Sequence, residues 1–264
     1  MKDQLITIIV NKLRTNQEPL KTQFSKEHPI KVARHFALDN LLPTEIAEKI
    51  YANFPHPRKM RLLHSRGELK LKYAQLKHTS TLLQDLHYAI QDPRVITEIE
   101  KITGIPHQLP DQSRLAGGVS ALLKSHYINP HLDNSHDVDK KLYRAVNLLY
   151  YATPDWKIEN GGNYELWDES VNHRIIVPSL FNRLVVMETN QTSWHAVNPV
   201  LCETPRLCVF NYYFKEQSPT AVDYFHGATS ILYNPLIKAR PEQKIRRKIR
   251  DMRDAVLRNI FLLK

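Results

Sequence analysis

Residues 129–133 have the sequence Asn-Pro-His-Leu-Asp, in which a histidine and an aspartate are two residues apart. In a β-strand, side chains two residues apart point to the same side. His131 and Asp133 can therefore bind one ion from the end of a strand, while Leu132 points the other way into apolar packing. The triplet predicts two ligands of a metal site on a β-structure.

His195 is the candidate for a third ligand from a different strand. A strongly β-forming run at 182–188 and a polar turn at 189–193 precede it, and a further strand is expected to begin at Trp194. Two histidines and one carboxylate form the facial triad that holds non-haem Fe(II) and leaves coordination positions open. A lone histidine is more often structural, but the ordered set of His131, Asp133 and His195 favours a catalytic iron site.

Arg206 is the candidate anion-binding residue. It lies at the start of a run rich in aromatic and branched residues, 207–214, which predicts a strand. The planar guanidinium group can pair with a carboxylate through two hydrogen bonds. A 2-oxo acid that chelates iron through its first carboxylate and keto oxygen needs such a partner for its far carboxylate.

These residues belong to a longer ordered set. Its members are His131-x-Asp133, residues 145–151, 161–167, 182–186 and 193–197, and Arg206. In order and spacing, the segment from about Arg114 to Phe214 resembles the Fe(II)- and 2-oxoglutarate-dependent oxygenases, and among them the prolyl-4-hydroxylase-like branch.

The resemblance implies a mainly β fold with a helical cover. Its core would be a double-stranded β-helix, a distorted jelly roll, with the metal at one open end. We expect one domain over 1–264, with a mostly helical part at 1–110, the catalytic core at 114–215 and a basic helix at 238–264. Periodicity alone predicts only a β-rich middle region.

The same resemblance implies cofactor roles. His131, Asp133 and His195 would bind Fe(II), and Arg206 would bind the distal carboxylate of 2-oxoglutarate. A tyrosine on the strand after the first ligands would add a hydrogen bond to that carboxylate. The register favours Tyr151, although the following Ala152-Thr153 departs from the family's Tyr-Leu-Asn pattern. Neighbours on a strand point to opposite faces, so Tyr150 and Tyr151 cannot share this role.

The expected reaction is an oxidation of the substrate by O2. In halogenating members of the class a small residue replaces the carboxylate ligand, so the presence of Asp133 favours hydroxylation. The resemblance implies that 2-oxoglutarate is consumed to give succinate and CO2, with ascorbate as a stimulant. Hydroxylation, desaturation and ring formation share this chemistry, and the sequence leaves the choice among them open.

Three further polar or aromatic residues lie near the candidate ligands. His136 follows the expected strand and is interpreted as a residue of the substrate mouth or a surface histidine rather than a ligand. Asn134 is a candidate for orienting a ligand through a hydrogen bond. Trp194 directly precedes His195 and so points away from the metal into the core.

Patterns before residue 110 predict helices. Ile46, Ile50 and Phe54 recur at helical spacing after Pro43, and further helices are expected at 79–90 and 93–102, the last closed by Gly104. The apolar stretch at the N-terminus is too short and polar for a signal peptide or a membrane span and indicates an amphipathic element.

Cysteine content bears on the compartment. With no secretion signal visible, Cys202 and Cys208 are interpreted as free thiols in a reducing cytoplasm. We therefore expect a cytoplasmic protein without a membrane span.

The net charge of +10 is concentrated at the C-terminus. Residues 238–264 hold ten Lys and Arg against three acidic residues, and apolar residues recur there at helical spacing. The basic amphipathic helix could be a solvated face packed on the body, a homodimer contact, or a patch for nucleic acid, an anionic carrier or a membrane surface. No recognition motif accompanies it, so nucleic acid is not an expected partner.

Four functions fit parts of this sequence. The leading one is an oxygenase that hydroxylates an unactivated C–H bond in a small molecule, amino acid or peptide-like metabolite. A protein or peptidyl-prolyl hydroxylase would use the same catalytic residues. Nucleic-acid demethylation occurs on the same fold, and a degenerate jelly-roll binding module would have a broken triad. The triad and Arg206 are intact, which favours an enzyme.

Overall fold

The computed structural model describes residues 1–231 except 66, 74–75, 112–115 and 221. The basic helix expected at 238–264 lies outside the described residues. The helices are α1 (Lys2–Thr15), α2 (Gln17–Ser25), α3 (Thr44–Ala52), α4 (Thr81–Ile90) and α5 (Pro93–Thr103), with short 3-10 turns at Pro57–Lys59, Leu76–His78 and Ile158–Asn160.

The strands follow in chain order. They are β1 (His35–Leu38), β2 (Arg61–His64), β3 (Glu68–Tyr73), β4 (Leu109–Pro110), β5 (Gly118–Leu122), β6 (Tyr127–Leu132), β7 (Tyr143–Tyr151), β8 (Tyr164–Trp167), β9 (Arg174–Val177), β10 (Arg183–Glu188), β11 (His195–Val197), β12 (Arg206–Lys215) and β13 (Thr229–Ser230).

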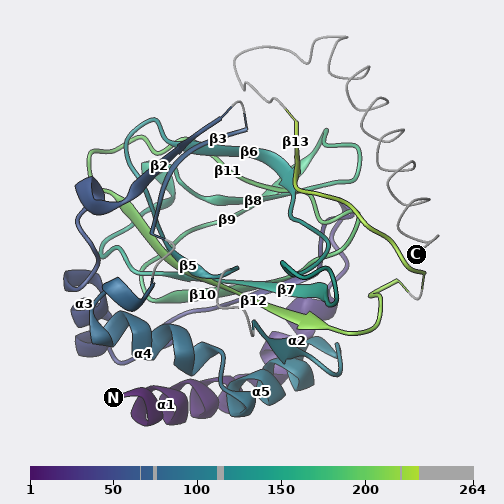
Figure 1. Ribbon diagram of the computed structural model, residues 1–264, viewed down its shortest axis with the longest axis horizontal. Coiled ribbons are helices and arrows are strands. Elements are labelled where there is room, and N and C mark those ends of the chain that lie inside the picture. The colour runs from purple at the N-terminus through teal and green to yellow at the C-terminus, as the bar shows by residue number, and fades with distance from the viewer. Residues whose placement is uncertain (66, 74–75, 112–115, 221, 232–264) are drawn as a thin grey trace.

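The strands form one antiparallel system that curls into a nearly closed barrel. Their order is β1-β10-β7-β12-β5-β3-β6-β11-β8-β9, with β2 added to β3, β4 to β12 and β13 to β6. In Figure 1 the wall of β10, β7, β12 and β5 faces the wall of β6, β11, β8 and β9. This arrangement confirms the predicted jelly roll with supporting helices.

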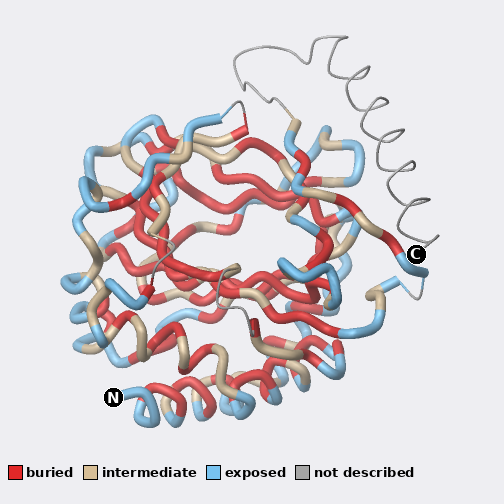
Figure 2. Tube along the Cα trace, in the orientation of Figure 1, coloured by how far each residue is buried: buried red, intermediate tan, exposed pale blue. Residues whose placement is uncertain are grey.

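Helices α1, α2, α4 and α5 lie on the outer side of the β10-β7-β12-β5 wall, where α1 packs on α4 and α5 (Figure 1). Side chains from these helices and from the outer face of the wall form one buried apolar cluster. A second cluster fills the barrel interior. Strand β7 lies between the two and is buried along almost its whole length (Figure 2), which accounts for its nearly continuous apolar sequence.

Local signals fix the ends of the supporting helices. The Ser80 side chain accepts a hydrogen bond from the Leu83 amide at the start of α4, and Asp92 accepts one from the Arg94 amide just before α5. Gly104 ends α5 with φ +66°, the left-handed conformation that glycine adopts most easily. The helices predicted at 79–90 and 93–102 are thus present with boundaries shifted by one or two residues.

Asn182 ties the N-terminal part to the barrel. Its side-chain oxygen accepts hydrogen bonds from the Leu42 amide at 3.0 Å and from the Tyr150 hydroxyl at 3.1 Å. Its side-chain nitrogen donates to the Leu42 carbonyl at 2.6 Å. Asn182 has φ +59°, a conformation that asparagine tolerates better than most residues. One buried amide therefore joins the entry to α3, strand β7 and the start of β10.

Strands β1, β2 and β3 lie within the part expected to be mostly helical. β1 pairs with β10 at the edge of the covered wall, and β3 lies between β5 and β6, where it connects the two walls. The hairpin of β2 and β3 therefore completes the barrel next to β6, the strand that carries His131.

Candidate metal and 2-oxo-acid site

Pairing of β6 with β11 brings the candidate ligands together. His131 on β6 lies opposite His195 on β11 in the antiparallel register, and Asp133 follows the end of β6. The His131 Nε2 atom is 3.8 Å from Asp133 Oδ1, and the His195 Nε2 atom is 3.6 Å from Asp133 Oδ2. One potential ligand atom from each residue lies within 4.8 Å of the other two. These separations suit three ligands of a single ion.

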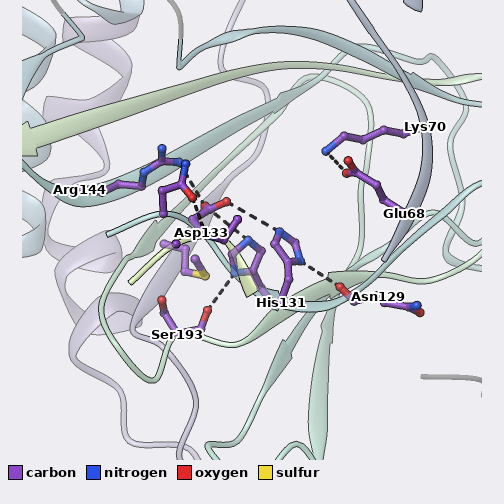
Figure 3. Close-up of polar contacts among 12 residues, drawn as sticks. Glu68, Lys70, Asn129, His131, Asp133, Arg144 and Ser193 are labelled. Carbon is purple, nitrogen blue, oxygen red and sulfur yellow. Dashed lines mark hydrogen bonds and ion pairs between the residues drawn. The ribbon is translucent and has the colours of Figure 1, made fainter. Parts of the chain in front are cut away.

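Both imidazole rings are held from behind by backbone carbonyl groups. The Nδ1 atom of His131 is 3.0 Å from the Asn129 carbonyl oxygen, and that of His195 is 2.9 Å from the Ser193 carbonyl oxygen. A protonated Nδ1 donates to the carbonyl and leaves Nε2 as the lone-pair donor. The partners of His131 and Asp133 can be followed in Figure 3.

The environment keeps both histidines neutral. Burial lowers the pKa of His131 to about 3, and the neighbouring His195 adds to this effect. Burial also lowers the pKa of His195. Neutral imidazole is the form that binds a metal, so protons compete weakly for these ligands near neutral pH.

Asp133 is ionised. Burial alone would raise its pKa, but Arg144, His195 and His131 outweigh burial and lower the pKa to about 2. The nearest Arg144 nitrogen is 3.5 Å from Asp133 Oδ2, and that buried oxygen accepts no hydrogen bond from the described residues. A buried carboxylate oxygen without a hydrogen bond is costly unless a ligand satisfies it. Two neutral imidazoles and this carboxylate fit Fe(II).

Arg206 lies at the start of β12, inside the barrel. The residue is only 3% exposed, and its Nε donates to the Ser179 hydroxyl at 3.4 Å. Among the described residues no carboxylate forms an ion pair with it. A buried guanidinium requires a counter-ion, so the arrangement suits a ligand carboxylate.

Tyr151 is the tyrosine that faces this arginine. The guanidinium carbon of Arg206 is 4.6 Å from the centre of the Tyr151 ring. Burial raises the pKa of the Tyr151 hydroxyl to about 12, so the group is protonated and can donate. Tyr150 points to the outer cluster and bonds Asn182 instead. The structure thus brings Tyr151, and not Tyr150, to Arg206.

Sequence reasoning missed two groups of residues at the site. Arg144 on β7 lies against Asp133, and Figure 3 shows it on one side of the ligands with Lys70 and Glu68 on another. Ser179 contacts Arg206 from the loop after β9. A cation within the apolar run 143–151 is a usable sequence signal, whereas nothing local distinguishes Ser179.

The other residues considered from the sequence lie outside the ligand cluster. His136 is buried against Tyr143, with ring centroids 4.2 Å apart, so it is neither a ligand nor a surface residue. Asn134 accepts a hydrogen bond from the Ala228 amide. Trp194 is buried in a separate small apolar cluster, as predicted.

Cys202 and Cys208 are free thiols in the structure, as predicted. Among the described helices, none combines the length and the apolar character needed to cross a membrane.

Residues 118–214 match the family model of the 2OG-Fe(II) oxygenase superfamily. The matched segment is less than half of the chain, and over this segment the chain is similar to the superfamily. The predicted cofactors, Fe(II) and 2-oxoglutarate, are those for which the superfamily is named. The matched segment contains His131, Asp133, His195 and Arg206.

Among curated proteins, prolyl 3-hydroxylase OGFOD1 of Mus musculus is 32% identical over 96 residues. The match covers 34% of this chain and 17% of that protein, so the chain spans only a small part of the relative's length.

Two solved structures have similar folds. A prolyl 4-hydroxylase from Phytophthora capsici has a TM-score of 0.57 at 14% identity, with 81% of this chain and 68% of that chain covered. A Pseudomonas putida prolyl-4-hydroxylase has a TM-score of 0.55 at 13% identity, with 80% and 98% covered. At these identities the likeness concerns the fold alone.

Proposed function

We propose that the chain is an Fe(II)- and 2-oxoglutarate-dependent dioxygenase that hydroxylates an unactivated C–H bond in a small molecule, amino acid or peptide-like metabolite. Succinate and CO2 are the co-products. One observation carries the proposal: three metal-binding side chains converge inside a barrel that also holds Arg206, a buried cation with no carboxylate partner among the described residues.

In this proposal His131, Asp133 and His195 would hold the iron, a ligand set that leaves room for a co-substrate and O2. Bound iron, with 2-oxoglutarate and O2, supplies the oxidising power for cleavage of the C–H bond. The carbonyl groups of Asn129 and Ser193 fix the two imidazoles, so the ligand atoms are preorganised before the metal arrives.

Arg206 and Tyr151 bind the distal carboxylate of 2-oxoglutarate. The guanidinium forms a charge-assisted pair with it, and the protonated Tyr151 hydroxyl donates to the same group. Ser179 holds the arginine through Nε, which leaves its terminal nitrogens to face the ligand.

The remaining barrel interior excludes water. Buried apolar side chains around the cofactor positions include Leu122, Leu166, Val185 and Val197. A dry cavity strengthens the ionic contacts of 2-oxoglutarate and limits side reactions of the oxidant. Asp133 occupies the ligand position that a halide would otherwise take, so hydroxylation is proposed rather than halogenation.

A peptidyl-prolyl hydroxylase is the second candidate. The observation that favours it is the match, over 96 residues, to a relative named as a prolyl 3-hydroxylase. Both candidates use the same ligands and differ only in the substrate that enters the mouth.

The test is succinate formation by purified protein supplied with Fe(II), ascorbate and 2-oxoglutarate, with an anaerobic control. Free amino acids and proline peptides are supplied in parallel arms. We expect release of succinate that requires O2 and is lost in His131→Ala. Stimulation by free amino acids favours the first candidate, and stimulation by proline peptides favours the second. Release that persists in His131→Ala would contradict the proposal.

A further inference from the structure

Strand β3 presents charged side chains to the mouth of the barrel. Glu68, Lys70 and Lys72 alternate with Leu69, Leu71 and Tyr73. Leu71 belongs to the apolar cluster on the outer side of the sheet, and Tyr73 packs against it. Alternate side chains point to opposite faces, so the charged residues lie on the inner face, toward the candidate ligands.

Lys72 is a half-buried cation on the inner face of β3. Its Nζ lies 5.0 Å from the centre of the Phe210 ring, and none of the described carboxylates forms an ion pair with it. Burial lowers its pKa, Lys70 and Arg144 lower it further, and Glu68 and Asp133 oppose this. Partial burial of an unpaired ammonium is unfavourable unless a ligand compensates it.

Arg144 approaches the same mouth from β7. Its guanidinium carbon lies 3.8 Å from the centre of the Tyr212 ring, and the residue is 8% exposed. Its buried Nε has no hydrogen-bond partner among the described residues. The carboxylate nearest to Arg144 is Asp133, which is committed to the metal in the proposed function.

Lys72 and Arg144 are not neutralised when the charges of a site with bound Fe(II) and 2-oxoglutarate are summed. The two positive charges of Fe(II) and the one of Arg206 balance the two negative charges of 2-oxoglutarate and the one of Asp133. Lys70 is paired with Glu68 at 2.7 Å. Lys72 and Arg144 therefore retain two uncompensated positive charges near Asp133.

An aromatic surface lies between these cations. Phe210 contacts Lys72 and Tyr212 contacts Arg144, and the two ring centroids are 6.3 Å apart on β12. Both residues are half-buried. The mouth thus combines an apolar surface with two cationic groups.

We propose that the substrate carries an anionic group, a carboxylate or a phosphate, that binds between Lys72 and Arg144 while its apolar part lies on Phe210 and Tyr212. This inference rests on the proposed function, because the anion positions a C–H bond near the metal. Two charge-assisted contacts fix the orientation of the substrate in addition to its affinity.

The test is an anaerobic titration of the protein loaded with Fe(II) and saturating 2-oxoglutarate. The visible absorption band of the iron chelate is recorded as matched probes are added. The carboxylate arm compares N-acetyl-L-proline with N-acetyl-L-prolinamide, and the phosphate arm compares O-phospho-L-serine with L-serine. We expect the anion of at least one pair to bind about tenfold more tightly than its neutral partner.

Variants locate the binding site of the anion. Lys72→Met and Arg144→Met should each reduce the preference for the anion, whereas Lys72→Arg and Arg144→Lys should retain part of it. Lys77→Met is the matched control, because Lys77 is exposed on the turn after β3. Thermal unfolding of each variant identifies any that fails to fold, and the conservative variants then carry the comparison.

Three results would overturn the inference: equal binding or no binding of the anion and neutral partner in both pairs, a preference unchanged by both substitutions, or competition between the anion and 2-oxoglutarate. The chelate band before any probe is added reports separately on the proposed function. A band that forms normally while no anion binds refutes only the inference, and a band that never forms refutes the proposed function.

Discussion

His131 and His195 lie directly opposite each other on β6 and β11, with ring centroids 4.1 Å apart. Their positions depend on strand register, because a slip of one residue would turn one ring to the opposite face of the sheet. The register shifts immediately after this pair, between His195 and Val197. The candidate metal site therefore forms only when β6 and β11 pair in this register.

Replacement of Arg206 tests the 2-oxoglutarate site. Loss of a buried charge-assisted pair costs about 2 to 3 kcal/mol, so Arg206→Ala should raise KM for 2-oxoglutarate by about 30- to 160-fold. Steady-state kinetics with varied 2-oxoglutarate checks this. Arg183→Ala is the control, since Arg183 pairs with exposed Asp39 at the barrel edge. Equal effects of the two substitutions would contradict the assignment.

Gly162 tests how closely the chain packs around Arg206. It has φ +62°, and an added Cβ would lie 2.9 Å from Val200 Cγ2 and 3.1 Å from Arg206 Cδ. We expect Gly162→Ala to destabilise the fold by about 1 to 2 kcal/mol and to weaken 2-oxoglutarate binding several-fold.

Gly104→Ala is the matched control for that substitution. Gly104 has φ +66°, but an added Cβ would meet no atom within 4 Å. The Gly104→Ala variant should lose about 1 kcal/mol in the free energy of unfolding, and its 2-oxoglutarate affinity should be unchanged. An unchanged affinity in Gly162→Ala as well would show that Arg206 is not positioned by this contact.

Asn182→Ala tests the connection between the N-terminal part and the barrel. The substitution removes three buried hydrogen bonds and places alanine at φ +59°, so we expect a loss of about 3 kcal/mol in the free energy of unfolding. Denaturant titration measures it. Asn53→Ala, which removes an exposed bond to the Lys49 carbonyl, should cost under about 0.5 kcal/mol. Similar losses in both variants would refute the connecting role.

The metal-free protein should lose stability as the pH falls below 6.5. A histidine with a lowered pKa stays neutral in the folded chain but gains a proton in the unfolded chain, so its contribution declines from pH 6.5 toward its folded pKa. For His131, with a folded pKa of about 3, the loss at pH 5 is about 2 kcal/mol. His195 acts in the same direction.

Chelator-treated protein unfolded by denaturant at pH 7 and pH 5 checks this prediction. His131→Gln should reduce the difference between the two pH values by about 2 kcal/mol, because glutamine does not titrate in this range. The pKa of Asp133 is lowered to about 2 in the folded chain. Its stabilising contribution is therefore lost only as the pH falls below the ordinary pKa of an aspartate. A pH dependence that is the same in the wild type and His131→Gln would contradict the account.

The candidate ligands could be proposed from the sequence because the side chains of His131 and Asp133 are two residues apart. Side chains two apart on a strand share a face, which placed His131 with Asp133 and separated Tyr150 from Tyr151. The sequence predicted only that His195 lies on a different strand, and its position opposite His131 comes from the pairing of distant strands, which has no local signal.

The hairpin of β2 and β3 was missed, although its sequence contained a signal. Residues Glu68–Tyr73 alternate charged and apolar side chains, a period of two that indicates a strand with one buried face. Four-residue β1 offers no comparable periodicity and is held by pairing with β10. Ser179 reaches Arg206 from a loop, and only closure of the barrel determines that contact.

Anaerobic Fe(II) titration in the presence of 2-oxoglutarate, followed by the absorption of the chelate, tests the central claim most directly. The account predicts one iron per chain in the wild type and loss of that binding in Asp133→Ala and His195→Ala, with His136→Ala unchanged because His136 lies outside the cluster. A wild-type protein that binds no iron, or Asp133→Ala and His195→Ala variants that bind it as the wild type does, would contradict the account.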